Sequence, residues 1–414
     1  MTAGLARLTR LLAAVLPAAA LLAPGRSPAA DWEQDPIRYS TAPADNAMNR
    51  LEPKLADGSV KFVHQGDTGH LRSLLTALNV PESSQVLVFS KTSLQRHRIG
   101  PATPRAVYFN DDLYVGYCQK GDVMEVAAAD PRLGTAFYTV GQKPGAPKVT
   151  RQAESCLLCH ASSKNRGVPG HVVLSVSPDR DGEPSLTGGF ARVDLTTPFA
   201  DRWGGWYVTG THGRMTHKGN RVGDADPAAG QNVTDLSGRF RTKPYLTPHS
   251  DLVALMVMEH QTATHNRLAR AALEGRVVLY RDDAGAERAI RELGDEVVDY
   301  LLFRNEARLT DRVAGTSSFA QEFAKRGPFD SKGRSLREFD LKTWLFKYPC
   351  SYLVYSPAFQ KLPAELKDYT LKRMYAILTG AEGQTEFAHL SADDRRAIRE
   401  ILTDTLPDKP DYWK

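Results

Sequence analysis

Five consecutive residues carry the strongest chemical signal in this chain: Cys156, Leu157, Leu158, Cys159 and His160. The spacing Cys-x-x-Cys-His is the attachment pattern of c-type haem. Two thiols separated by two residues reach the two vinyl groups on one edge of a porphyrin and form thioethers. The imidazole that follows lies under the ring, and histidine is a strong axial ligand for haem iron. The motif therefore predicts one covalent haem c on Cys156 and Cys159, with His160 as the proximal iron ligand.

Two other uses of a Cys-x-x-Cys motif fit this sequence less well. A thioredoxin-like motif lies between a strand and a helix in a βαβ pattern and needs no histidine. A zinc site needs a second pair of ligands at a similar spacing, whereas the remaining cysteines, Cys118 and Cys350, are isolated. The sequence leaves open whether these two pair in a disulfide, which an oxidising compartment permits, or remain separate buried thiols.

The N-terminus supports export, which haem c attachment requires. Arg7 and Arg10 form a positive region, residues 11–23 are mainly apolar, and small residues precede position 31. This is the pattern of a secretory signal peptide over residues 1–30. The alternative is a retained membrane anchor, but the apolar run is shorter than the ~20 residues that a bilayer needs, and a proline interrupts it. We expect a periplasmic protein with no transmembrane segment after cleavage.

Composition limits the classes of partner. The 414 residues have ordinary globular usage, with 42% hydrophobic and 24% charged residues. Residues 1–30 hold three arginines and no acid, so their removal lowers the formal charge from +5 to about +2. No basic stripe with interleaved aromatics is visible, so we expect no nucleic acid. The expected partner is a redox partner protein or a small-molecule substrate.

The elements predict an α+β fold, with a β-containing N-terminal region, a haem-binding middle segment and a mainly helical C-terminal half around one covalent haem c. The boundaries are residues 1–30 for the signal peptide, 31–148 for the α+β region, 149–245 for the haem-attachment and glycine-rich segment, and 246–414 for the helical region. We expect an irregular arm over 31–60, a short helix over 151–160, and helices over 251–274 (with Ser250 as its N-cap), 341–346 and 348–355.

The sixth iron position decides the function. A strong Met or His ligand there makes an electron carrier, whereas an open position permits substrate chemistry. The candidates for the sixth ligand or the haem pocket are His212, Met215, His217, Met256, Met258, His260 and His265. On the predicted helix over 251–274, Met256 and His260 share one face, and Met258 and His265 share another, about 160° away.

A second metal is an additional hypothesis. His212, His217, Glu259, His260 and His265 offer four imidazoles and a carboxylate, and imidazole sets suit iron, copper or zinc. Histidines five residues apart do not share a helical face, so a common site would need several elements.

Four segments together resemble a family of large exported mono-haem cytochrome c domain proteins, which are mostly uncharacterised in bacteria. They are the Cys156–His160 motif, the Trp-Gly-Gly-Trp-Tyr-Val-Thr-Gly-Thr-His block that ends at His212, Met258-Glu-His260-Gln, and Tyr348-Pro-Cys350-Ser-Tyr. The resemblance covers roughly residues 60–380. It implies a covalent haem c with His160 as ligand and no particular reaction, and a single attachment motif argues against the di-haem peroxidases.

We therefore expect one-electron redox chemistry at a single haem. An electron-transfer protein is the first hypothesis. A haem oxidoreductase with an open or displaceable sixth ligand is the second, since almost 400 residues exceed the needs of a simple carrier. A haem-based sensor ranks last, because no signalling module is visible.

Overall fold

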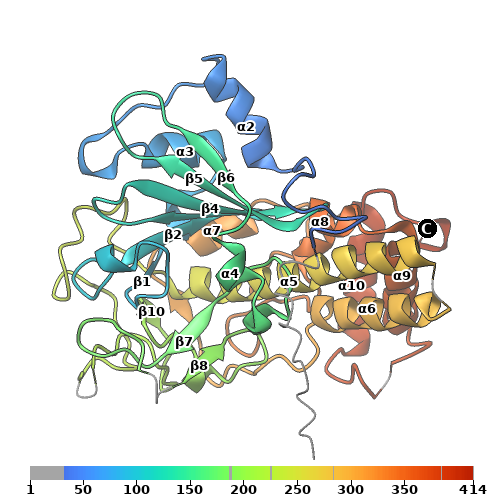
Figure 1. The fold of residues 1–414 in the computed structure, drawn as a ribbon. Coiled ribbons are helices and arrows are strands. Elements are labelled where there is room, and N and C mark those ends of the chain that lie inside the picture. Colours follow the sequence, from blue (N-terminus) through green and yellow to red (C-terminus); the bar gives the residue numbers. More distant parts are fainter. Residues whose placement is uncertain (1–31, 186–188, 224–225, 283, 384, 414) are drawn as a thin grey trace, which may run out of the picture.

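The fold is α+β, as the sequence predicts. The structure, a computed structural model, describes residues 32–185, 189–223, 226–282, 284–383 and 385–413, so the predicted signal peptide lies outside the described residues. A large antiparallel sheet occupies the N-terminal half, and most of the long helices lie in the C-terminal half (Figure 1).

The main sheet has seven strands in the order β6-β5-β4-β3-β2-β1-β9, and all neighbouring pairs are antiparallel. The strands are β1 Val86–Val88, β2 Arg105–Phe109, β3 Leu113–Tyr117, β4 Val123–Asp130, β5 Gly134–Gly141, β6 Val149–Gln152 and β9 Trp206–Tyr207. Strands β1 to β6 lie side by side in sequence order, and short turns join β2 to β3 and β4 to β5. In one turn, the Asn110 side chain accepts hydrogen bonds from the backbone of Asp112 and Leu113.

The two faces of this sheet pack against different helices, since alternate side chains of a strand point to opposite faces. Tyr108, Val115 and Val126 share a hydrophobic cluster with α3 (Leu71–Ala77) and α2 (Ala47–Ala56). Phe109 and Tyr114 belong to a second cluster with α5 (Leu252–Arg281). Figure 1 shows α2 and α3 above the sheet and α5 below it. We call these the α3 face and the α5 face.

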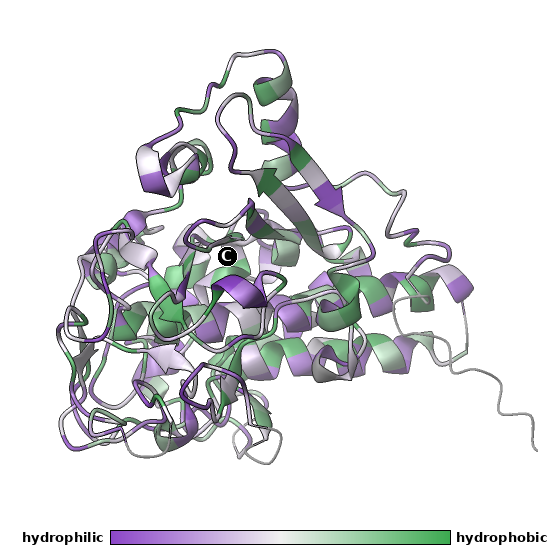
Figure 2. Cartoon of the chain, turned by 60° about the vertical axis from the view of Figure 1, so that its left-hand side comes forward, coloured by the Kyte–Doolittle hydropathy of each residue, from purple (hydrophilic) through white to green (hydrophobic). Residues whose placement is uncertain are grey.

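Helix α5 is the centre of the C-terminal half. It has 30 residues, and almost all of its first half is buried on every side. The other long helices, α6 (Ala286–Leu301), α9 (Ala364–Thr379) and α10 (Ala392–Thr405), form a helical layer with it. Hydrophobic residues gather where the helices and strands meet (Figure 2). No helix in the described ranges has the length and hydrophobicity to cross a membrane.

Short elements complete the fold. They are α4 (Leu157–His160), α7 (Phe319–Ala324), α8 (Pro357–Gln360), the strand pair β7 (Leu174–Val176) with β8 (Phe190–Arg192), and the pair β10 (Gly210–Thr211) with β11 (Ala314–Gly315).

Several local predictions were wrong. The arm over 31–60 contains α2, capped by the Asn46 side chain. The first part of the predicted 151–160 helix is the end of strand β6, because pairing with β5 continues to Gln152. Residues 341–346 form no helix, and only a 3-10 turn, Tyr352–Tyr355, occurs within 348–355. The N-cap of α5 is Asp251, not Ser250.

Candidate functional site

Cys156, Cys159 and His160 lie on one helical turn. The backbone amides of Cys159 and His160 both donate to the carbonyl oxygen of Cys156, at 3.2 and 2.9 Å. Residues at positions i, i+3 and i+4 share a helix face, so both thiols and the imidazole are presented together. Leu157 anchors the turn, because its side chain is buried in the core, whereas Leu158 is 76% exposed.

Both thiols of the motif are free. Cys156 is partly buried, Cys159 is exposed, and neither forms a disulfide. Burial raises the pKa of the Cys156 thiol. Cys118 and Cys350 are also free and both are buried, so the structure has two separate thiols here. Burial raises the pKa of Cys118 to about 11, which keeps this thiol protonated and unreactive near neutral pH.

The orientation of His160 is fixed by Gly170. The Nδ1 atom of His160 lies 2.8 Å from the carbonyl oxygen of Gly170. A carbonyl only accepts hydrogen bonds, so Nδ1 carries the proton and Nε2 keeps its lone pair. Burial lowers the pKa of His160, which favours the neutral imidazole that a metal requires. This backbone contact is the usual way in which proteins orient a ligating histidine.

The loop that carries Gly170 is itself held by α5. The Asn266 side chain accepts a hydrogen bond from the backbone amide of His171 at 2.7 Å and donates to the His171 carbonyl at 2.8 Å. A Cβ atom at Gly170 would overlap the side chains of Asn165 and Asn266. The Gly170 carbonyl therefore depends on a glycine at this position and on Asn266. Both lie outside the motif.

The α5 face of the sheet lies beside the Cys156–His160 turn. The ring of His160 contacts the ring of Phe137 on β5, with centroids 4.5 Å apart. Phe137 pairs with Ala127 on β4 and with Gln152 on β6, so these side chains share the α5 face. Ala127 and Gln152 remain partly exposed although they belong to the main sheet.

The opposite face is covered more completely in the same region. Met124, Val126 and Ala128 of β4 are buried on the α3 face, whereas the alternate residues Glu125 and Ala127 are only partly buried. Other elements therefore cover the sheet surface beside His160 incompletely, and the small side chain of Ala127 projects little from it. Two free thiols, a neutral imidazole with a lone pair on Nε2, and partly exposed side chains on the neighbouring sheet surface fit a covalently held porphyrin.

Four of the seven sixth-ligand candidates lie on α5, and two of them form hydrogen bonds elsewhere. Met256 and Met258 are buried in the core. The Nε2 atom of His260 lies 2.8 Å from Ser351 Oγ. The Nδ1 atom of His265 lies 3.1 Å from the Tyr114 hydroxyl. Met215, the fifth candidate, accepts a hydrogen bond at its sulfur from the Thr310 amide at 3.4 Å.

His212 and His217 form a buried pair away from α5. Their ring centroids are 4.8 Å apart, and Phe199 contacts both rings. The Nδ1 atom of His217 accepts a hydrogen bond from the Gly219 amide at 2.9 Å, so in the neutral ring the proton lies on Nε2. Burial lowers the pKa of His217 to about 3. Neither nitrogen of His217 therefore offers a free lone pair to a metal.

The predicted second-metal residues are not brought together. Within the described ranges, no three or more His, Cys, Asp or Glu side chains are grouped so that they could hold a metal ion. Glu259 instead forms a buried ion pair with Arg202 at 3.2 Å.

His171 is a residue that the sequence did not single out. Its ring contacts those of Tyr114 and His265, with centroids 4.4 and 5.6 Å away. Its Nε2 atom lies 3.3 Å from Thr135 Oγ1. Among the sixth-ligand candidates, His265 therefore has a ring contact with His171, the residue directly after Gly170.

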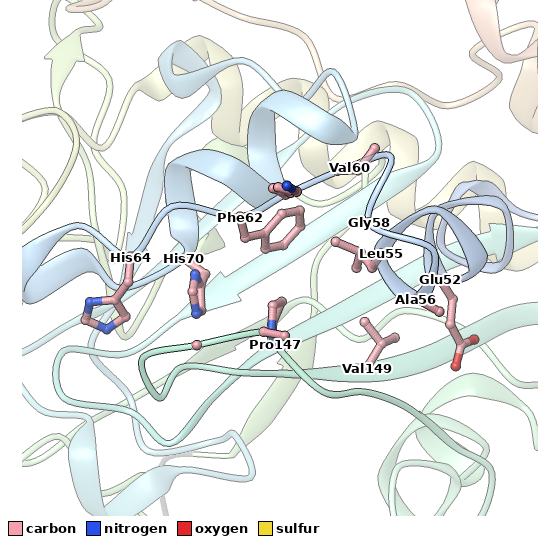
Figure 3. Close-up of a pocket in the computed structure, with 13 residues that line it drawn as sticks. Glu52, Leu55, Ala56, Gly58, Val60, Phe62, His64, His70, Pro147 and Val149 are labelled. Carbon is pink, nitrogen blue, oxygen red and sulfur yellow. The ribbon is translucent and has the colours of Figure 1, made fainter.

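A pocket of about 650 Å³ lies elsewhere, between α2 and the loop that joins β5 to β6 (Figure 3). Its walls are mainly apolar, with Leu55, Phe62 and Val149, and His64 and His70 lie at one end. Val149 alternates with Thr150 and Gln152 along β6, so this pocket opens on the α3 face, opposite to His160.

Comparisons with protein-family models, with curated proteins and with solved structures found no match to this chain.

Proposed function

We propose that this protein is an exported mono-haem c-type cytochrome that carries out one-electron redox chemistry. The observation that carries the proposal is the single helical turn that presents two free thiols and the Nε2 atom of His160 on one face. The hydrogen bond between His160 and Gly170 adds the tautomer that an iron ligand needs.

The residues of the chain have distinct roles in this proposal. Cys156 and Cys159 hold the porphyrin edge through thioethers, and His160 binds the iron. Asn266 and Gly170 keep the imidazole in position. A bound haem c supplies an iron that gains or loses one electron. The signal peptide predicted over residues 1–30 supports a periplasmic location, where we infer that a redox partner docks.

The direct test is production in a bacterial host that exports the protein and attaches haem c. The expected result is a red protein that keeps its haem through denaturing gel electrophoresis. A colourless protein from a host that matures a control cytochrome c in parallel would refute the proposal.

A second candidate function is a haem oxidoreductase with an accessible sixth iron position. The positions of the candidate ligands favour it. The three methionine candidates are engaged in the fold, since Met256 and Met258 are buried in the core and Met215 accepts a backbone hydrogen bond at its sulfur. In this candidate function, an external small molecule takes the sixth position. Binding of carbon monoxide to the reduced protein distinguishes the two functions.

A further inference from the structure

One largely buried charged pair lies on the α5 face of the sheet. The backbone pairing of the strands does not require these two charges. Arg105 on β2 and Glu125 on β4 form an ion pair at 2.6 Å. Their side chains are 21% and 17% exposed. Ser93 Oγ lies 3.0 Å from a carboxylate oxygen of Glu125, and Gln95 Nε2 donates to the other oxygen at 3.2 Å. Three side chains, those of Arg105, Ser93 and Gln95, therefore hold the carboxylate in one position.

The pair crosses a whole strand. Arg105 belongs to β2 and Glu125 to β4, and β3 lies between them. Gly116 of β3 pairs with Glu125, and a Cβ atom at Gly116 would overlap the Arg105 guanidinium. The guanidinium therefore lies flat against the sheet because residue 116 has no side chain. Any larger residue would lift Arg105 away from the strand.

The register places this pair on the same surface as the ring contact of His160. Glu125 and Ala127 are two residues apart on β4, so their side chains share a face. Ala127 pairs with Phe137, whose ring contacts His160. The charges of Arg105 and Glu125 also act on His160 and on the thiol of Cys156. The pair is thus the charged part of the surface that faces the attachment turn.

We propose that Arg105 and Glu125 act with opposite sign on the reduction potential of the haem carried by Cys156, Cys159 and His160. This inference rests on the proposed function. Oxidation of the iron adds one positive charge to the site. The guanidinium disfavours the oxidised state and raises the potential, and the carboxylate does the reverse. The two effects largely cancel while the ion pair is intact, so the separate charges become visible when one partner is removed.

The test is a redox titration of the purified haem protein and its variants. R105Q is expected to lower the midpoint potential, E125Q to raise it, and the R105Q/E125Q double variant to return most of the way to the parent value. G116A keeps every charge but displaces the guanidinium, so a smaller decrease than that of R105Q is expected. Because the G116A overlap is with the end of a flexible side chain, this variant keeps the fold.

R334Q is the matched control. Arg334 is equally buried, at 20% exposure, and pairs with Asp330 and Glu400 beside α10. Its replacement is expected to leave the potential unchanged. Shifts of the same sign in R105Q and E125Q, or potentials equal to the parent in both, would overturn the inference. Absence of covalent haem in the parent protein would instead refute the proposed function, so the two failures are distinguishable.

Discussion

The Nδ1 atom of His160 donates a hydrogen bond to the carbonyl oxygen of Gly170, 2.8 Å away. The two residues are joined a second time, because the amide of Gly170 donates to the carbonyl of His160 at 3.1 Å. Asn266 of α5 holds the next residue, His171, through both of its backbone groups. The orientation of the imidazole is therefore tied to the central helix of the C-terminal half.

Replacement of Asn266 by alanine tests this connection. The variant loses two buried hydrogen bonds, and we expect its unfolding free energy to fall by about 1–3 kcal/mol. Covalent haem is retained because Cys156 and Cys159 are unchanged, but a smaller fraction of the iron keeps its His160 ligand. Visible spectroscopy of the ferric protein measures this fraction. Asn49→Ala on α2, where the side chain is exposed, serves as control, and identical spectra for both variants would contradict the positioning role.

The thioether assignment predicts a graded response to cysteine substitution. Cys156→Ala and Cys159→Ala each leave one thiol for attachment, so each is expected to reduce covalent haem strongly. The double variant removes it. Cys118→Ala and Cys350→Ala change buried thiols outside the turn and keep normal attachment wherever they fold. Haem staining after denaturing electrophoresis measures how much haem stays attached. Full retention of haem in the double variant would contradict attachment through Cys156 and Cys159.

The buried imidazole of His260 predicts a pH-dependent stability. Burial lowers its pKa to about 3, whereas an unfolded histidine titrates near 6.5. Below pH 6.5 the unfolded chain binds a proton that the folded protein does not bind until about pH 3, so stability falls as the pH decreases through this window. One such group contributes up to about 1.4 kcal/mol per pH unit.

His260→Gln removes this contribution. Urea unfolding at several pH values between 4 and 6.5 is expected to give a shallower dependence of stability on pH for the variant than for the parent. The absolute stability of the variant decreases at every pH, since His260 stacks on Phe303 with centroids 4.6 Å apart. The slope is therefore the informative quantity, and parallel slopes would show that His260 is not held neutral.

The second candidate function leaves the sixth iron position without a protein ligand, and it therefore predicts an accessible iron. We expect the reduced protein to bind carbon monoxide rapidly and the ferric protein to bind cyanide. The Soret band shift on mixing measures both. Indifference to both ligands would identify a closed, six-coordinate iron and remove the second candidate function, while the electron-transfer function would stand.

Local sequence signals predicted the β-containing N-terminal region and the central helix. The apolar pattern of 251–274 corresponds to α5, whose start differs by one residue because two cap-forming side chains are adjacent. Asp251 accepts from the amides of Val253 and Ala254. Ser250 instead accepts from the Leu87 amide and donates to the Tyr207 carbonyl, which ties β1 to β9. Only the folded sheet decides between the two caps.

Strand β6 is an element that the local sequence did not predict. All four of its residues are partly exposed, and their sequence carries only a weak strand pattern. Pairing with β5 determines their conformation, and such long-range pairing is not encoded in local propensity. The arm helix Ala47–Ala56 is different, because its cap Asn46 is local in sequence and its buried residues Met48 and Leu51 pack in the cluster on the α3 face.

The candidate site also combines residues that the local sequence reveals with residues that only the fold brings together. The motif itself is local, so its three residues are visible in the sequence. Gly170 and Asn266 lie 10 and 106 residues beyond His160, and nothing in their immediate neighbours marks them. Arg105 and Glu125 are ordinary charged residues until the register of β2, β3 and β4 brings them together across Gly116. These partners are products of the fold.

The intact mass of the exported protein under denaturing conditions shows whether a haem is covalently attached. Thioether attachment at Cys156 and Cys159 predicts a mass that exceeds that of the processed polypeptide by one haem group, and loss of this increment in the Cys156→Ala/Cys159→Ala double variant. A mass equal to that of the polypeptide alone, from a host with working haem-attachment machinery, would contradict it.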